Sequence, residues 1–179
     1  MRGENGDVLI TIIGIIIAVF LMLFVPLMAV ANNQEDVAQL AAQEETQEFV
    51  NKIATKGTIT QDDLDTFLQS LSKDGNSYEF EIEVQILDEN PGKKASVTSG
   101  DLIGENIRYS EFTQAILENI ANSSDGKYKL KKGDNIIVRI NNTNTTLAQL
   151  LRNFEYKVVG KDTYQIGASA SAMVQNNGK

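Results

Sequence analysis

The hydrophobic pattern of the chain begins with one long apolar run near the N-terminus. Residues 8–31 contain no charged side chain, and Thr11 is the only residue among them with a polar side chain. A helix of about 20 residues crosses the hydrocarbon core of a bilayer, whereas a helix on the surface of a soluble protein needs a polar face. The run therefore predicts a transmembrane helix that anchors the protein.

The segment after this run, residues 32–57, predicts a stalk helix that continues the membrane helix outward. No helix breaker lies between Pro26 and Gly57, and we expect the helix to stop at Gly57. The glutamates of the segment are interpreted as a solvated face. Two apolar stripes are expected on the stalk, one of Val37, Leu40 and Ala41 and one of Phe49, Val50 and Ile53.

The rest of the chain predicts a small α+β head with an antiparallel sheet. Its clearest strand covers residues 78–86, where apolar and polar side chains alternate strictly. Residues 87–106 predict an exposed loop. Further strands are predicted at residues 135–140 and in a hairpin of residues 156–160 and 163–174. The last strand carries small residues on one face, which indicates that a helix packs close to it.

Three short helices complete the predicted head. Apolar residues at helical spacing place them after Thr60, at about residues 110–121, and after Thr146. Thr60 with Asp63 and Thr146 with Gln149 have the spacing of capping boxes. The three apolar faces consist of Leu64, Phe67, Leu68 and Leu71, then Phe112, Ile116, Leu117 and Ile120, then Leu147, Leu150, Leu151 and Phe154.

The composition excludes several kinds of chemistry. The chain has no histidine and no cysteine, which excludes thiol catalysis, disulfides, a histidine general base and the usual zinc sites. Its net charge of −8 argues against a nucleic-acid partner, which would require a basic surface. Because no phosphate-binding glycine motif or nucleophile motif is present either, we expect no catalytic residue, no cofactor and no metal, and hence no enzyme.

Three charged clusters have a structural interpretation and a functional alternative. The aspartates after Thr60 are favoured by the dipole at a helix N-terminus and lack the ligand spacing of a calcium loop. The glutamates on the strand of residues 78–86 are interpreted as a solvated sheet face, with a cation or a basic partner as the alternative. Four lysines are interpreted as a solvated strand face, with contact to anionic lipid headgroups as the alternative: Lys127, Lys129, Lys131 and Lys132.

The charges that flank the apolar run predict its orientation. Arg2 precedes the run and acidic residues follow it, so the positive-inside rule places the N-terminus in the cytoplasm of a single-pass protein of the cell membrane. The expected organisation is a cytoplasmic N-terminus (1–7), a transmembrane helix (8–31), a stalk helix (32–57) and an extracytoplasmic head (58–179).

Two processing events remain open. Ala29 and Ala31 form an A-x-A tripeptide, and cleavage after Ala31 by signal peptidase would release a secreted soluble binding module. Prepilin-type cleavage after Gly3 or Gly6 would instead leave the apolar run at the new N-terminus. Type IV pilins usually carry a glutamate five residues after the cut, where this chain has Val8 or Thr11 depending on the glycine.

Three stretches carry a resemblance to a known family: MRGENGDVLITIIGIII, FVNKIATKGTITQDDLDTFLQSLSKDGNSYEFEIEV and YKLKKGDNIIVRINNTNTTLAQLLRNF. They resemble the TadE-like pseudopilins of Tad (tight adherence) pilus systems, in the variety found in Gram-positive bacteria. The resemblance implies a pilin-like fold and a minor pilin or assembly component of a type IV-like pilus or secretion apparatus. It also implies an oligomer with other pilin-like proteins, formed through the N-terminal helix.

Overall fold

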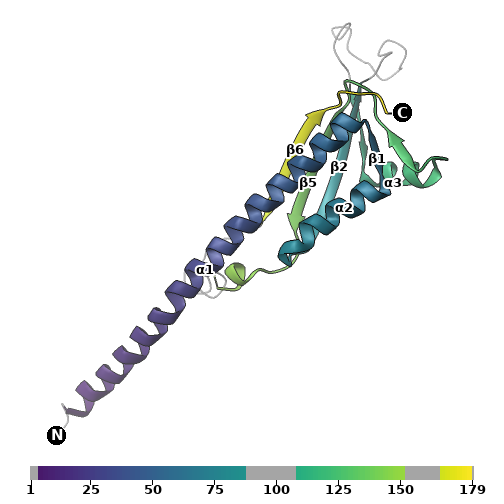
Figure 1. The fold of residues 1–179 in the computed structure, drawn as a ribbon. Coiled ribbons are helices and arrows are strands. Elements are labelled where there is room, and N and C mark those ends of the chain that lie inside the picture. The colour runs from purple at the N-terminus through teal and green to yellow at the C-terminus, as the bar shows by residue number, and fades with distance from the viewer. Residues whose placement is uncertain (1–3, 88–107, 152–165, 179) are drawn as a thin grey trace, which may run out of the picture. The chain divides into compact units, whose positions relative to one another are not determined.

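The computed structural model describes residues 4–87, 108–151 and 166–178 (Figure 1). The elements follow one another as α1 (Glu4–Lys56), β1 (Thr58–Thr60), α2 (Gln61–Leu71), η1 (Ser72–Asp74), β2 (Tyr78–Leu87), β3 (Arg108–Phe112), α3 (Thr113–Asn122), β4 (Lys127–Lys129), β5 (Asn135–Asn142) and β6 (Gly167–Met173). A further helical turn covers residues 147–151. The protein is therefore α+β, with a long apolar N-terminal helix followed by antiparallel sheets and short helices, as predicted.

The chain divides into two compact units. One unit combines Met1–Ala38 with Thr145–Tyr164, and the other combines Gln39–Asn144 with Gln165–Lys179. The predicted strand at residues 156–160 and nearly all of the loop predicted at 87–106 lie outside the described residues.

Helix α1 continues without interruption for 53 residues, passes through Pro26 and ends where the sequence predicts. Gly57 follows it with a φ of 73° and donates its N–H to the carbonyl of Ile53. A positive φ favours glycine and ends the helix. A Cβ at this position would also overlap backbone atoms of Asn176 and Gly178. The end of α1 is thus fixed both by backbone conformation and by the close approach of the C-terminal segment.

The larger sheet has four strands in the order β3-β2-β5-β6, and every pair is antiparallel. In its centre Ile82 of β2 lies opposite Val138 of β5, which lies opposite Ala170 of β6. Strands β1 and β4 form a separate antiparallel pair. The strict alternation over residues 78–86 therefore correctly predicts β2, which occupies a central position in the sheet.

One face of the larger sheet is buried, and helices supply the opposing side chains. Phe49 of α1 stacks on Phe67 of α2 with ring centroids 4.4 Å apart. Figure 1 shows the C-terminal part of α1 alongside β6. The buried apolar side chains of this core include Phe49, Val50, Ile53, Leu64, Phe67, Leu71, Ile82, Val84, Ile136, Val138, Ile140, Ala168 and Ala170.

The small residues of β6 allow α1 to lie directly against this strand, as predicted. Gln39 both donates to the carbonyl of Gly167, at 2.6 Å, and accepts from the N–H of the same residue, at 3.0 Å. One turn later Gln43 donates to the carbonyl of Ser169 at 3.2 Å. Two side-chain amides therefore satisfy backbone groups on the edge of β6 that would otherwise face solvent.

Two predicted elements differ in the structure. The helix expected over residues 110–121 is α3, and it begins only at Thr113, because residues 108–112 pair with β2 as a strand. Phe112, expected to point inward, is 50% exposed on that strand. The stripe expected from Val37, Leu40 and Ala41 is also exposed, and alanines on the other side of α1 are buried instead: Ala31, Ala38 and Ala42.

Candidate functional site

The first candidate site is the apolar segment of α1, which we define as residues 8–31. Large apolar side chains are exposed all around it, including Ile10 at 69% and Met22 at 78%. An 18-residue window of α1 has a mean hydropathy of 3.3 and contains no residue that is buried in the structure. By length and composition, α1 can cross a membrane.

The polar groups of the apolar segment are satisfied within the helix. Thr11, its only polar side chain, donates its hydroxyl to the carbonyl of Asp7 at 2.8 Å. The rings of Phe20 and Phe24 stack on each other at 5.3 Å. A helix that pairs its own backbone and hydroxyl groups leaves no unpaired donor to face hydrocarbon. The segment is therefore chemically suited to lipid.

The predicted processing residues have different surroundings. Gly6 is helical, and a Cβ added there would have no atom within 4 Å. Gly3 lies outside the described residues. Ala29 and Ala31 both lie inside the continuous helix α1, and Ala31 is buried, with 2% of its surface exposed.

A second feature of the same unit is the helical turn at residues 147–151. Thr146 and Gln149 form the predicted capping box, with each backbone N–H donating to the other side chain at 3.0 and 3.2 Å. The Thr146 hydroxyl also donates to Glu35 of α1 at 3.2 Å. Glu35 is only 5% exposed, so the interpretation of all stalk glutamates as a solvated face is wrong for this residue.

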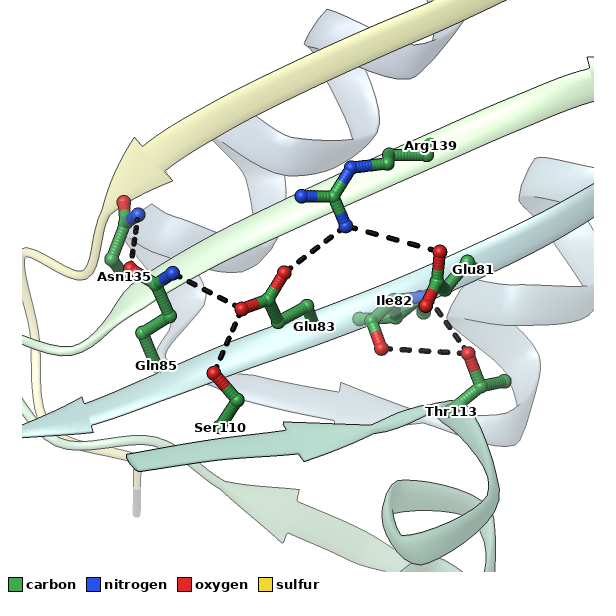
Figure 2. A network of polar contacts seen from close by, with 8 residues as sticks. All are labelled: Glu81, Ile82, Glu83, Gln85, Ser110, Thr113, Asn135 and Arg139. Carbon is green, nitrogen blue, oxygen red and sulfur yellow. Dashed lines mark hydrogen bonds and ion pairs between the residues drawn. The ribbon is translucent and has the colours of Figure 1, made fainter. Parts of the chain in front are cut away.

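The face of the sheet opposite α1 carries a network of polar side chains, shown in Figure 2. Glu83 accepts from Ser110 of β3 at 2.8 Å, from Gln85 at 3.1 Å and from Arg139 of β5 at 3.0 Å. Glu81 lies 3.8 Å from the same guanidinium group. The hydrogen bonds from Ser110 and Gln85, together with Arg139, lower the pKa of Glu83 despite its burial.

The network includes two of the three glutamates that the sequence places on the polar face of β2. Glu79 is exposed as expected, but Glu81 and Glu83 are paired with an arginine from the neighbouring strand. Within the described residues, no group of acidic side chains is arranged to hold a metal ion. Two of the three glutamates are therefore engaged with Arg139, while Glu79 remains on the solvated face that the sequence predicts.

The aspartate cluster at the start of α2 is a capping site. Thr60 and Asp63 form both hydrogen bonds of a capping box. Asp63 is buried and makes ion pairs with Lys52, at 3.1 Å, and with Lys56. Burial raises the pKa of Asp63, but the hydrogen bonds from Lys56, Thr60 and Lys52 outweigh it and hold the pKa at about 2. The helix-terminus interpretation of this cluster is confirmed.

The lysine cluster lies on β4 and the turn that follows it. Tyr128 and Leu130 between the lysines are buried, as the strand interpretation predicts. Tyr128 donates to Glu111 at 2.8 Å, and burial together with this carboxylate raises the pKa of the phenol far above its usual range. Lys129 makes an ion pair with Asp125 at 2.9 Å, while Lys132 is exposed.

A shallow cleft of about 520 Å³ opens beside these lysines. Its charged lining consists of Lys127, Lys129, Lys131, Glu111, Asp125 and Asp134. Because three carboxylates accompany the three lysines, the cleft has no excess of positive charge. A surface that attracts anionic headgroups depends on such an excess. The cleft therefore gives no support to the lipid alternative for these lysines.

Comparison with known proteins found no matching family model, no matching curated protein and no matching solved structure.

Sequence reasoning missed two features of these sites. Arg139 lies on the polar face of β5, opposite Glu81. Its position in the predicted strand of residues 135–140, where successive side chains point to opposite faces, could have predicted this placement. The burial of Glu35 had no such signal, because it depends on a residue more than 100 positions away.

Proposed function

We propose that this protein is a membrane-anchored structural component, a minor pilin or assembly protein, of a Tad/type IV-like pilus or secretion apparatus. The observation that carries the proposal is the exposed apolar surface of residues 8–31. Each Å² of apolar surface left in water costs about 25 cal/mol, so a helix exposed in this way requires lipid or neighbouring helices around it. The resemblance of the chain to TadE-like pseudopilins supplies the pilus context.

The proposed mechanism is lateral packing of α1 and contacts made by the head. In lipid, helices associate through close van der Waals contact, which small residues promote. Gly14 lies within the apolar segment, and a Cβ added there would have no neighbouring atom within 4 Å, which leaves room for an adjacent helix. The N-terminus lies in the cytoplasm and the head outside the cell.

The head supports a role in protein contacts rather than in catalysis. Its two buried carboxyl groups with a lowered pKa, Asp63 and Glu83, are engaged in a helix cap and in a cross-strand network. In a catalytic site, carboxyl groups with a shifted pKa would face a cleft that holds the substrate. These two stabilise elements instead.

The orientation is tested by labelling single cysteines in intact cells. The chain contains no cysteine, so Lys132→Cys in the head and Asp7→Cys before the apolar segment each create one reactive thiol, and residue 7 is retained after cleavage at either glycine. A maleimide that cannot cross membranes should label the first variant in intact cells and the second only after lysis. Labelling of the Asp7→Cys variant alone in intact cells would contradict the orientation.

The pilus assignment is tested by deleting the protein from its host. We expect surface pili to be lost or sharply reduced in electron micrographs, and to return when the intact gene is restored. Pili of normal number and length in the deletion strain would contradict the pilus role and leave the membrane anchor untouched.

A further inference from the structure

The helical turn at residues 147–151 has its apolar side chains on the outside. Leu147 is 47% exposed and Leu150 is 57% exposed, whereas Ala148 and Gln149 between them are buried at 2% and 6%. A turn that packs on a protein core in water buries its leucines and exposes its glutamine. The turn therefore presents two leucines outward while it buries a glutamine, a pattern that an apolar neighbour would satisfy.

The position of the turn along α1 identifies those surroundings. Thr146, the residue that caps the turn, donates a hydrogen bond to Glu35. Glu35 is the first charged residue after the apolar segment and follows Ala31 by four residues, which is about 6 Å along a helix. The turn is thus held beside the end of the apolar segment, where the interface between lipid and water begins.

The polar groups of the turn are arranged as this location requires. The capping box satisfies the backbone N–H groups of Thr146 and Gln149. The Glu35 carboxylate is buried and hydrogen-bonded, so it does not face the acyl chains. Charged side chains close to hydrocarbon are found turned toward protein partners in this way.

We propose that residues 147–151 form a membrane-surface contact, in which Leu147 and Leu150 insert between the lipid headgroups at the point where α1 leaves the bilayer. Amphipathic helices lie in this interface with their apolar face buried about 5–10 Å into the boundary between headgroups and acyl chains. The contact adds a second attachment point to the anchor and fixes the rotation of α1 in the membrane. It rests on the proposed insertion of the apolar segment.

Single tryptophans test the contact, because the chain contains none. Leu147→Trp and Leu150→Trp report on the turn, and tryptophan itself is favoured at lipid interfaces. Ile16→Trp, inside the apolar segment, reports on membrane insertion. Leu40→Trp is the matched control, since Leu40 is a 68% exposed leucine on α1 about 14 Å beyond Ala31 at about 1.5 Å per residue.

The full-length variants are reconstituted into phosphatidylcholine–phosphatidylglycerol vesicles with and without acyl chains brominated near the headgroup. Circular dichroism melting confirms that each variant is folded. Bromine quenches the fluorescence of a tryptophan that lies close to it. We expect the brominated lipid to quench about half or more of the tryptophan fluorescence at positions 147 and 150, because these side chains lie in the interface. Emission at position 40 should change little.

Three other results would contradict the surface contact, and they differ in what they say about the membrane anchor. Quenching at position 16 combined with no more quenching at 147 and 150 than at 40 would overturn the surface contact and leave the membrane anchor intact. Blue-shifted but unquenched emission at 147 and 150 would also overturn it, because a protein partner such as a second copy would then cover the leucines. No quenching at position 16 would overturn both the contact and the anchor.

Discussion

At the residue scale, the charged side chains with the strongest interactions are held by partners from different elements. Asp63 at the start of α2 is held by two lysines of α1 as well as by its own cap residue. Glu83 on β2 is held by Ser110 of β3 and Arg139 of β5. Each carboxylate therefore ties together different elements of the head, and its protonation should loosen them.

Asp63 should make the stability of the protein depend on pH. Its pKa is about 2 in the folded protein against 3.8 ordinarily, so its contribution is fully present above about pH 4 and is lost as the pH falls toward 2. A difference of this size corresponds to about 2 kcal/mol. We expect Asp63→Asn to lower the free energy of unfolding by about that amount at pH 7, and by much less at pH 2.

Urea unfolding of the full chain in detergent at a series of pH values measures this effect. Asp62→Asn is the control, because Asp62 is an exposed neighbour in the same helical turn. A constant difference between wild type and Asp63→Asn across the pH range would contradict the role assigned to the ion pairs.

The two glutamates beside Arg139 should differ in their coupling to it. The Glu83 pair is 3.0 Å long and its carboxylate is 10% exposed, whereas the Glu81 pair is 3.8 Å long and its carboxylate is 51% exposed. Exposed pairs at long distance contribute little because water screens them. Double-mutant cycles with Glu83→Gln, Glu81→Gln and Arg139→Gln should give about 1 kcal/mol for Glu83 and under about 0.5 kcal/mol for Glu81. Equal coupling energies would refute this ranking.

At the element scale, the features that depend only on residues close in sequence were predictable. The capping boxes that begin at Thr60 and Thr146, the central strand β2 and the end of α1 all follow from local spacing, and the structure confirms them. Strand β3 was not predictable, because residues 108–112 become a strand only by pairing with β2. The outward leucines of the turn at 147–151 depend on what lies beside α1, which local spacing does not encode.

The end of α1 provides a prediction about glycine. Gly57 combines a φ of 73° with backbone atoms of Asn176 and Gly178 where a Cβ would stand, whereas Gly126 has a φ of 65° and free space around it. Gly126→Ala should therefore cost only the conformational strain, about 1 kcal/mol. Gly57→Ala should cost about 3 kcal/mol or more, since the C-terminal segment must also move. Thermal melting of both variants measures the difference, and similar melting temperatures would contradict the close approach.

At the scale of the whole molecule, the chain combines a long helix suited to lipid with an α+β head. The long apolar helix was predictable, because 24 consecutive residues without charge have few other uses. Two features of the first unit were outside the reach of sequence reasoning. The burial of Glu35 and the placement of the turn at 147–151 arise from a return of the chain to α1 after β5.

We expect residues 8–31 to remain attached to the protein and to hold it in the membrane. The most direct test is to wash membranes of the native host with alkaline carbonate and measure the intact mass of the protein in each fraction. We predict that the protein stays in the membrane pellet with an N-terminus at Met1, or at Glu4 or Asp7 after prepilin-type cleavage. A protein found in the soluble fraction, with a mass that begins at Asn32, would contradict it.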